Sequence, residues 1–544
     1  MTTRKKAVRG VSRAFAWTIL ACFFAALPAP AQSNQQKQGA CCAAKPSAKK
    51  KKKSRAAEQA ARFTARAEVL LGGGPAAKGA WGILIVDEKS GETLYELNAD
   101  KYFVPASNLK LFTTALALAK LGPEYRFHTT LETRGTISAE GLLNGDLILA
   151  GRGDPNLSNR KFPYVLKEEF DGPPEKVLAE LADALMTRGV KEISGDIVGD
   201  DSYFPRERYP SGWEIDDMVW QYGAAISAIV VDDNTVTLTL TPGERAGDPV
   251  QAVMAPATPD FTVENDVVTS AADVKADLAL TRDPGASMVA VRGMLPAKTA
   301  PRKLVLAVEE PAQHAAALLA GLLGDRGVKI GGKARAVHVP ETAAAPRAVL
   351  AEHVSVPLGD ATKLVNKISQ NLHAEMLLRA AARQNGLWNT PEDLEKFPED
   401  FYTAAGIAPG DVVQTDGSGL SRRDLVTPRA VAALLKYAKD QAWFGTYYAS
   451  LPVAGEDGSL EDRMKSTVAA GKIHAKTGSL EHVRARSGYA ETPGGRRLIF
   501  SFLSNNMGGK NHEATDALDG LCVAMIEEFN ETPASVKKCA KNCE

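Results

Sequence analysis

The sequence is poor in aromatic residues and has no excess of either charge. Phe, Trp and Tyr make up 6% of its 544 residues, and 65 Lys and Arg balance 65 Asp and Glu. Composition therefore gives no case for nucleic-acid binding. The hydrophobic fraction of 44% is ordinary for a globular protein, which excludes wholesale disorder, a collagen-like chain and a multispan membrane protein. The length suggests roughly three or four domains.

Cysteine is also scarce, with six residues in the chain. Cys22 lies in an expected export signal, and its removal leaves an odd set whose pairing cannot be deduced: Cys41, Cys42, Cys522, Cys539 and Cys543. An oxidising compartment would permit bridges in the C-terminal group. No nearby histidine completes a ligand set with zinc-like spacing. We therefore expect neither a metal nor an organic cofactor.

Acidic residues are absent from the first 55 positions, which carry thirteen Lys or Arg. Without these thirteen, 52 basic residues face 65 acidic ones, so the rest of the chain has a net charge near −13. The protein is predicted to be an acidic globule behind a basic leader.

Residues 1–31 have the order of a secretory signal, with a cationic start, an apolar stretch from Ala14 to Leu27 and small residues at Ala29-Pro30-Ala31. The apolar stretch is shorter than the roughly 18 to 20 residues that cross a bilayer comfortably. We predict export to the periplasm or cell envelope of a bacterium. A retained anchor and lipidation at Cys22 are the alternatives.

Residues 32–57 form a basic, low-complexity segment that contains the lysine run Lys49–Lys53. Like charges at this density repel and prevent a core from forming, which predicts a solvated tether. The alternative is that the lysine run makes a peripheral electrostatic contact with anionic envelope polymers or lipid headgroups.

The rest of the chain contains two kinds of region, which differ in their hydrophobic periodicity and in their content of Gly and Pro. Helical periodicity and apolar strands occur in two separated parts, and between them lies a region of short strands with many Gly and Pro residues. We expect a discontinuous catalytic domain built from residues 58–125 and 351–530, interrupted by one or more inserted β-rich α+β domains at 126–350. Residues 531–544 form a cysteine-containing tail.

Several elements are expected within this plan. The patterns predict a hairpin over 81–97 and helices over 58–71, 108–121, 361–384, 428–442 and 514–529. Two stretches of the inserted region, Pro173–Gly195 and Pro311–Gly332, each contain a helix that ends in Arg-Gly-Val-Lys. Their glycines suit the left-handed position after a helix. We predict two similar helix–strand units packed in one module, with chance similarity as the alternative.

Ser107 and Lys110 lie three residues apart at the start of an amphipathic helix, a spacing that places both side chains on one face. A serine hydroxyl becomes a strong nucleophile only when a base takes its proton, and an amine serves if its pKa is lowered. Burial and a second cation both lower a lysine pKa. Lys476, in Ala475-Lys476-Thr477-Gly478-Ser479, is the candidate second cation. Ser369-Gln370-Asn371 opens another helix and offers a hydroxyl and an amide.

Each of these motifs is weak alone, because the chain contains several other matches to the same short patterns. Ser47/Lys50, Ser158/Lys161 and Ser535/Lys538 repeat the Ser-x-x-Lys spacing, and Lys89-Ser90-Gly91 imitates the lysine motif. Only Ser107, Ser369 and Lys476 place two serines at helix starts and a lysine on a strand, in that order.

The three motifs resemble those of the penicillin-recognising serine enzymes. Longer stretches resemble the D-alanyl-D-alanine carboxypeptidase/endopeptidase family of class C penicillin-binding proteins: Pro105–Lys110, Gly151–Pro155, Gly195–Asp201, Asp416–Arg422, Leu451–Gly455 and Ala475–Leu480. The resemblance covers roughly residues 80–530. It implies an α/β fold of α+β type, a β-lactamase/transpeptidase-like α/β/α sandwich around an antiparallel sheet.

The resemblance also implies a role for each site residue. Ser107 would be the acylated nucleophile, Lys110 its general base, and Ser369 and Asn371 a proton relay and substrate support. Lys476 and Thr477 would bind the terminal carboxylate of the peptide. The strand residues Gly478 and Ser479 would line the substrate, and the backbone amides of Ser107 and Ser479 would form the oxyanion hole.

Further residues have less certain roles. Asp217 is similar to a family position that contacts the amino group of the stem-peptide diamino acid, although adjacent Asp216 is an alternative. Ser418 and Arg422 are substrate-binding candidates, with a loop stabilised by Asp416 as the alternative. Four residues are expected to be structural: Asp154 and Asp200 in turns, and His373 and His474 as packed, neutral histidines.

The predicted protein is a serine D-Ala-D-Ala carboxypeptidase that acts on peptidoglycan stem peptides, binds penicillin and other β-lactams covalently and also cuts cross-links as an endopeptidase if its pocket allows. Two alternatives are a β-lactamase and a non-catalytic peptidoglycan-binding or scaffold protein of the same fold. No dedicated deacylating carboxylate supports the first, and three intact motifs argue against the second.

Overall fold

The computed structural model describes residues 55–165, 168–258, 261–340, 346–387, 389–509 and 511–531, all of which belong to one unit, Lys53–Glu544. The predicted export signal, the lysine run Lys49–Lys53 and the cysteines at positions 41, 42, 539 and 543 lie outside the described residues. The first helix, α1 (Arg55–Leu71), begins within the predicted tether, so residues 55–57 are helical. Contacts at this end explain the early start, because Gln59 Nε2 donates to the Glu531 backbone oxygen at 3.0 Å.

Strands from the two ends of the chain form one antiparallel sheet, in the order β2-β1-β24-β23-β22. The predicted hairpin is confirmed as its first two strands. The sheet consists of β1 (Ala80–Asp87), β2 (Thr93–Leu97), β22 (Ile473–Leu480), β23 (Val483–Glu491) and β24 (Arg497–Asn505).

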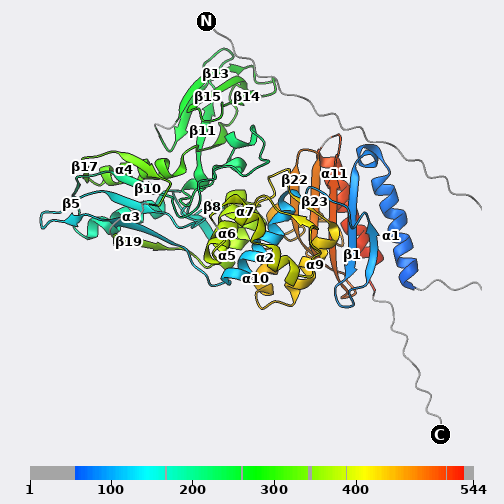
Figure 1. The fold of residues 1–544 in the computed structure, drawn as a ribbon. Coiled ribbons are helices and arrows are strands. Elements are labelled where there is room, and N and C mark those ends of the chain that lie inside the picture. Colours follow the sequence, from blue (N-terminus) through cyan, green and yellow to red (C-terminus); the bar gives the residue numbers. More distant parts are fainter. Residues whose placement is uncertain are drawn as a thin grey trace, which may run out of the picture. The chain divides into compact units, whose positions relative to one another are not determined.

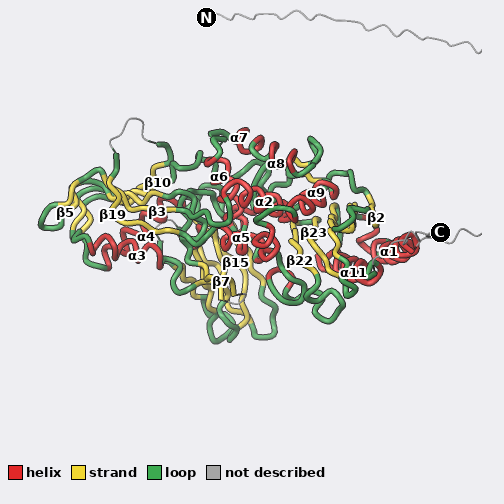
Figure 2. The backbone as a smooth tube through the Cα atoms, turned by 90° about the horizontal axis from the view of Figure 1, so that it is seen from below, coloured by secondary structure: helices red, strands yellow, loops and turns green. Residues whose placement is uncertain are grey.

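Both faces of this sheet are buried. Successive side chains of a strand point to opposite faces. Phe500 and Phe502 of β24 therefore pack with α1 and α11 (Asn511–Glu528), whereas Ile499 and Leu503 pack with α2 (Lys110–Leu121) and α9 (Pro428–Lys439). Figures 1 and 2 show helices on the two sides of these strands. The predicted mixed α/β fold with helices around an antiparallel sheet is confirmed.

The remaining helices of this part lie around α2. They are α5 (Leu358–Lys367), α6 (Asn371–Gln384), α7 (Pro391–Lys396), α8 (Glu399–Ala404) and α10 (Phe444–Ser450), accompanied by the short strands β20 (Val412–Val413) and β21 (Leu425–Val426). The helical pattern predicted over 361–384 is divided at Ser369, whose φ of +64° is left-handed. The break places Ser369 and Asn371 at the start of α6.

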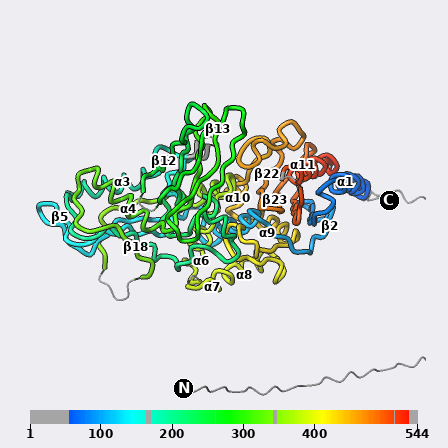
Figure 3. The backbone as a smooth tube through the Cα atoms, turned by 90° about the horizontal axis from the view of Figure 1, so that it is seen from above, coloured from blue at the N-terminus to red at the C-terminus, as the bar shows by residue number. Residues whose placement is uncertain are grey.

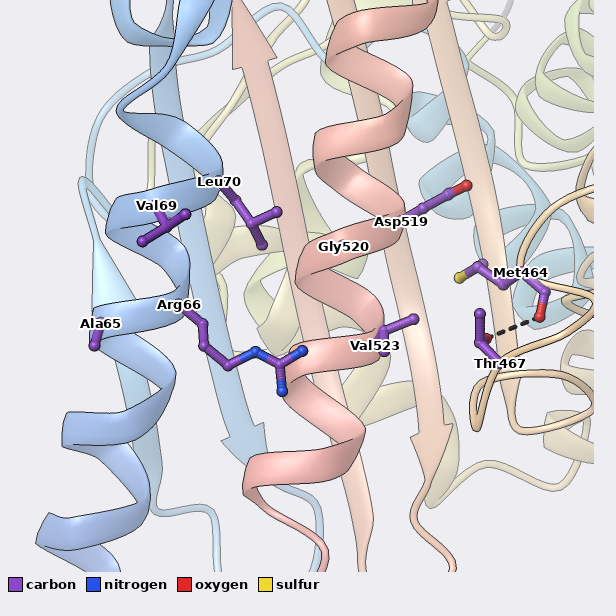
Figure 4. Close-up of a pocket in the computed structure, with 9 residues that line it drawn as sticks. All are labelled: Ala65, Arg66, Val69, Leu70, Met464, Thr467, Asp519, Gly520 and Val523. Atoms are coloured by element: carbon purple, nitrogen blue, oxygen red, sulfur yellow. Dashed lines mark hydrogen bonds between the residues drawn. The ribbon is translucent and has the colours of Figure 1, made fainter.

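The first and last helices pack closely. The Gly520 Cα in α11 faces Leu70 of α1 so closely that an added Cβ would lie 2.7 Å from Leu70 Cδ2. Arg66 of α1 forms ion pairs with Glu527 and Glu528 of α11. Figure 4 shows the groove of about 630 Å³ beside this contact, lined by residues of both helices and of the loop that carries Met464 and Thr467.

The region between the two parts that form this sheet contains β-rich layers with the helices α3 (Lys176–Thr187) and α4 (Pro311–Asp325). Its strands are β3 (His128–Thr133), β4 (Thr136–Ile137), β5 (Leu142–Asn144), β6 (Leu147–Ala150), β7 (Arg160–Val165), β8 (Glu168–Phe170), β9 (Glu192–Ile193), β10 (Ile197–Asp200), β11 (Thr235–Thr241), β12 (Gln251–Ala255), β13 (Thr262–Ser270), β14 (Asp277–Thr281), β15 (Met288–Pro296), β16 (Arg302–Ala307), β17 (Lys329–Ile330), β18 (Ala334–Val337) and β19 (Ala348–Val354). They form the sheets β18-β10-β6-β3-β19, β17-β9-β5-β4, β12-β11-β16, β13-β15-β14 and β7-β8. Figure 3 shows β12 and β13 in the green part of the chain.

The two similar sequence units lie side by side in this region. Helix α3 contacts α4, β9 pairs with β17, and β10 pairs in parallel with β18. The prediction of two related helix–strand units in one module is confirmed. Across the described ranges, no helix combines the length and the apolar character needed to cross a membrane.

Candidate active site

Ser107 lies in a short 3₁₀ turn, Ala106–Leu109, which leads directly into α2. Ala106 is held in the left-handed region with a φ of +48°, which is uncommon for a residue with a side chain. Gly419 lies against this turn, since an added Cβ there would be 2.0 Å from the Ala106 oxygen. The backbone before the serine is therefore fixed by a close contact that only glycine permits.

The Lys110 ammonium lies at the centre of the site. Its Nζ donates to Ser107 Oγ at 2.9 Å, to Asn371 Oδ1 at 2.6 Å and to the Ser418 backbone oxygen at 2.6 Å. These three contacts join three segments of the chain. They aim the amine at the serine hydroxyl in the geometry that a general base requires.

Burial lowers the pKa of Lys110 to about 7, although the carboxylates of Asp416, Glu375 and Asp424 act in the opposite direction. The side chain is fully buried, so its charged form has lost its hydration. An amine with this pKa is partly neutral near neutral pH and can accept a proton from serine.

Ser369 and Lys476 form a second pair. Lys476 Nζ donates to Ser369 Oγ at 2.9 Å and to the Thr477 backbone oxygen at 2.9 Å. Burial, together with the charge of Lys110, lowers the pKa of Lys476 well below its ordinary value. The charge of Lys110 is thus close enough to affect the pKa of Lys476, and the structure brings together the two amines that the motifs contain.

Strand β22 carries Lys476–Ser479 past the serine. Asn108 Nδ2 donates to the Lys476 backbone oxygen at 3.2 Å, and an added Cβ at Gly478 would lie 2.7 Å from the Pro105 oxygen. The strand therefore lies directly against the turn that holds Ser107. The Thr477 hydroxyl is 2.6 Å from Ser459 Oγ.

A cavity of about 450 Å³ opens above these groups. Its lining includes the predicted site residues Ser107, Ser369, Asn371, Ser479, Asp217 and Arg422, together with Asp216, Tyr222, Glu214 and Glu481. One side of the cavity is acidic. Burial raises the pKa of Asp217, and the neighbouring Asp216 and Glu214 raise it further. Glu214, Asp216 and Asp217 are the group of described residues close enough together to hold a cation, although exposed acidic groups often gather without one.

Arg422 and Ser418 differ in their access to this cavity. Arg422 lines it and forms an ion pair with Glu214, from Nε to Oε1 at 2.6 Å. Ser418 is fully buried, and Asp416 accepts hydrogen bonds from its hydroxyl and from its backbone nitrogen. The contact of Ser418 with the site is its backbone oxygen, which binds Lys110.

Three of the four residues predicted to be structural, Asp154, Asp200 and His474, are placed as expected. Asp154 and Asp200 accept backbone hydrogen bonds two residues further on, at 2.9 and 3.0 Å, as turn residues do. His474 stacks on Tyr448 with 4.1 Å between ring centroids, and burial lowers its pKa. His373 is buried, but its Nε2 lies 2.9 Å from Asp233 Oδ1, a polar contact that the sequence did not predict.

Four further residues near the site were not predicted. The backbone oxygen of Tyr222 accepts a hydrogen bond from Asn371 Nδ2 at 2.8 Å. The Asp233 carboxylate accepts one from Gln370 Nε2 at 2.9 Å. Asn108 supports β22, and Glu375 accepts from the Gly417 nitrogen at 2.9 Å. Only Glu375 had a local signal, because it lies four residues after Asn371 on the same helix face.

Comparisons with known proteins agree on one group. The model of the D-Ala-D-Ala carboxypeptidase 3 (S13) family matches residues 66–525. A D-alanyl-D-alanine carboxypeptidase of Actinomadura sp. (strain R39) is 35% identical over 465 residues, which cover 83% of this chain and 82% of that protein. A Haemophilus influenzae D-alanyl-D-alanine carboxypeptidase is 27% identical over 428 residues, covering 77% and 84% of the two chains. The crystal structure of penicillin binding protein 4 from H. influenzae matches with a TM-score of 0.72 and 25% identity, covering 86% of this chain and 99% of that one.

Proposed function

Because the chain belongs to the D-Ala-D-Ala carboxypeptidase 3 (S13) family, we propose that Ser107 is the acylated nucleophile of a D-Ala-D-Ala carboxypeptidase. The family resemblance expected from the three motifs is confirmed, and with it the prediction of a serine-type D-Ala-D-Ala carboxypeptidase. The observation that carries the proposed role of Ser107 is its contact with Lys110, whose buried Nζ lies 2.9 Å from the serine oxygen.

The reaction begins when neutral Lys110 takes the proton of Ser107 Oγ. The oxygen attacks the carbonyl carbon of the penultimate D-alanine, and the backbone N–H groups of Ser107 and Ser479 stabilise the oxyanion. The C–N bond breaks, and the leaving amine receives a proton through Ser369, which Lys476 contacts at 2.9 Å. Water then hydrolyses the acyl-enzyme and regenerates the hydroxyl.

The cavity suits a stem peptide at both of its ends. Lys476 and the Thr477 hydroxyl bind the terminal carboxylate of the substrate, whose negative charge favours the protonated form of this buried lysine. Asp217, with Asp216 as the alternative, binds the amino group of the diamino acid. Arg422, Gly478 and Ser479 line the peptide, and Asn371 orients its amide. Ser418 contributes through its backbone oxygen to Lys110 rather than through its buried hydroxyl.

Several finer features complete the proposal. Residues 58–125 and 351–530 form the catalytic domain around the insertion at 126–350. The protein is exported to the periplasm or cell envelope by the signal over residues 1–31. β-Lactams acylate Ser107, since the cavity accepts an acyl-D-Ala-D-Ala analogue. A cross-linked dimer contains two joined stem peptides. It is a substrate as well if the acidic side of the cavity has room for the second of these peptides.

Labelling with fluorescent penicillin tests the proposal. The native protein takes a long-lived covalent label, and Ser107→Ala loses it while remaining folded. Ser90→Ala is the matched control, because Ser90 belongs to the imitating Lys-Ser-Gly sequence, binds Asp87 in a turn and lies outside the cavity. Folded native protein without label would favour the scaffold alternative, and a rapidly cleared label would favour the β-lactamase.

Incubation with defined muropeptides tests the substrate. We expect release of D-alanine from a pentapeptide by the native protein and none by Ser107→Ala. Cleavage of a cross-linked dimer in the same assay measures endopeptidase activity. Turnover by Ser107→Ala would contradict the assigned nucleophile.

A further inference from the structure

The turn Asp232-Asp233-Asn234 of the inserted region has an unusual backbone. Its three residues have φ values of +49°, +50° and +58°. A residue with a side chain rarely adopts this left-handed conformation, and here three consecutive residues do. Asn and Asp tolerate it better than most residues. Such strain persists only where the surroundings impose it, and it gathers at functional sites.

Hydrogen bonds from several segments hold this turn. The Asp233 nitrogen donates to Ser158 Oγ at 2.7 Å, and Asn234 Nδ2 donates to the Ala225 oxygen at 3.0 Å. The Val308 nitrogen donates to the Asn234 oxygen at 2.8 Å. These contacts fix the direction in which the Asp233 carboxylate points.

That carboxylate points at the Ser369-Gln370-Asn371 motif. Asp233 Oδ2 accepts from Gln370 Nε2 at 2.9 Å, and Oδ1 lies 2.9 Å from His373 Nε2. Arg160 Nε donates to the same Oδ2 at 2.8 Å from within the inserted region. Burial would raise the pKa of Asp233, but the charges of Arg160 and His373 overcome it and lower the pKa, so the carboxylate is ionised.

Outside the inserted region, the motif is held by Lys476 at Ser369, by Lys110 at Asn371 and by the start of α6. Ser369 is itself left-handed, and it lies between the end of α5 and the start of α6. The side chain of Gln370 caps α6 by accepting from the Leu372 nitrogen at 2.8 Å. Besides the contact of Asp233 with Gln370, the inserted region supplies a second contact to the motif, because the backbone oxygen of Tyr222 accepts a hydrogen bond from Asn371 Nδ2. The motif is thus held by the insertion at both Gln370 and Asn371.

We propose that Asp233 is a positioning residue for catalysis: through Gln370 and His373 it holds Ser369 and Asn371 at their distances from Lys476 and Lys110. The inserted region is then part of the catalytic apparatus rather than an accessory. This inference rests on the proposed roles of Ser369 and Asn371. It assigns Asp233 no contact with the substrate.

Positioning and binding have different kinetic consequences. A displaced Ser369 or Asn371 slows the chemical step, and a misplacement of about 1 Å costs on the order of 100-fold in rate. The terminal carboxylate of the substrate binds Lys476 and Thr477, which Asp233 does not touch. Loss of the contact should therefore lower the maximal acylation rate while changing the half-saturating penicillin concentration by less than about threefold.

A reversal of the hydrogen bond provides the test. Gln370→Glu keeps the cap on α6 but places a second carboxylate against Asp233, and we expect its maximal acylation rate to fall roughly 10- to 100-fold. The double variant Asp233→Asn/Gln370→Glu removes the repulsion between the two carboxylates and pairs an amide donor with a carboxylate, although that amide also faces the Arg160 Nε that donates to Asp233 Oδ2. We expect its rate to rise at least about threefold above that of Gln370→Glu.

Asp232→Asn is the matched control. Asp232 lies in the same strained turn, and burial raises its pKa to about 8, so its carboxyl is largely neutral and an amide replaces it with little change. We expect the maximal acylation rate of Asp232→Asn to equal that of the native protein. Thermal melting of all four proteins separates a displaced motif from a loss of folding.

The outcomes are distinct. Native acylation by Gln370→Glu, or a double variant no faster than Gln370→Glu, would overturn the positioning role, and so would a loss in Asp232→Asn equal to that in Gln370→Glu. Failure of the native protein to label at Ser107 would instead overturn the proposed function itself.

Discussion

Lys110 is a buried amine whose surroundings fit catalysis better than stability. It contacts a hydroxyl and two carbonyl oxygens, and no carboxylate touches it directly. A buried cation without a direct counter-charge costs folding free energy. Burial lowers its pKa to about 7, a value that would let it act as the proposed base near neutral pH.

The first prediction concerns pH. Acylation requires neutral Lys110, so the acylation rate should fall about tenfold per pH unit below roughly pH 7 and level off above it. Lys110→Met should lose more than about 1,000-fold in rate at every pH. Stopped-flow acylation with a chromogenic β-lactam measures both.

The same shift predicts the pH dependence of stability. The folded-state pKa of Lys110, about 7, lies below the unfolded value, so the unfolded chain binds more protons between about pH 7 and pH 10.5. This group therefore makes the free energy of unfolding rise with pH in that window, and Lys110→Met should remove that part of the rise.

Glu375 provides the control, because burial raises its pKa to about 7 as well. Glu375→Gln should keep the acid limb of the rate profile and move it to lower pH, since a nearby negative charge that favours protonated Lys110 is gone. Loss of the limb in this variant would assign it to Glu375 instead.

Individual residues differed in how well the sequence revealed them. Ser107 and Lys110 were predictable because three residues of helix bring them together, whatever the rest of the chain does. Lys476 required the family resemblance, because nothing local indicates what strand β22 lies against. Asp233 and Tyr222 could not be found, since their contacts with Gln370 and Asn371 join residues more than 130 positions apart.

At the scale of elements, the contact between α1 and α11 depends on a residue without a side chain. The second prediction is that Gly520→Ala destabilises the fold by no more than about 1 kcal/mol, because the new Cβ would meet Leu70 Cδ2 at 2.7 Å and this flexible, partly exposed side-chain end must turn away. Acylation per folded molecule should stay native, since Gly520 lies outside the cavity that contains Ser107.

Gly321, inside α4, is the matched control. Apart from its chain neighbours and the backbone of its own helix, no atom of the described residues lies within 4 Å of the position of its added Cβ. Gly321→Ala should therefore stabilise the protein by about 0.5 to 1 kcal/mol through helix propensity. Urea denaturation of both variants measures the change in the free energy of unfolding, which should have opposite signs. A Gly520→Ala variant as stable as the native protein would show that α1 can move away without cost.

Elements were more predictable than their ends and breaks. Periodicity located α9 and α11 to within a few residues, because each buries an apolar face. The pattern located α2 as well, although that helix is buried continuously from Lys110 to Leu118. The break at Ser369 was only partly predictable, since the motif indicated a helix start but no local pattern indicates a left-handed serine between two helices. The pairing of α3 with α4 was predictable from their repeated endings alone.

The whole molecule has several hydrophobic cores of unequal quality. The catalytic sheet is buried on both faces, whereas the sheet β13-β15-β14 exposes much of its surface, and its core is small. Regions with few buried apolar contacts open first. The third prediction is that amides of β13–β15 exchange with deuterium at least about tenfold faster than those of β22–β24.

Hydrogen-exchange mass spectrometry on the intact protein tests this. Peptides from β3, β6 and β10 serve as the internal comparison, because they lie in the insertion but belong to a buried sheet. Equal protection of all three sheets would mean that the protein opens only as a whole.

The pairing of β1 with β24 has a consequence for biosynthesis. Ala80 lies opposite Asn505, so the centre of the catalytic sheet stays incomplete until the ribosome has made more than 400 further residues. A nascent chain can assemble the insertion early, but its nucleophile gains its full surroundings only after synthesis is nearly over. The edge of β1 that pairs with β24 therefore stays open until the last part of the chain arrives.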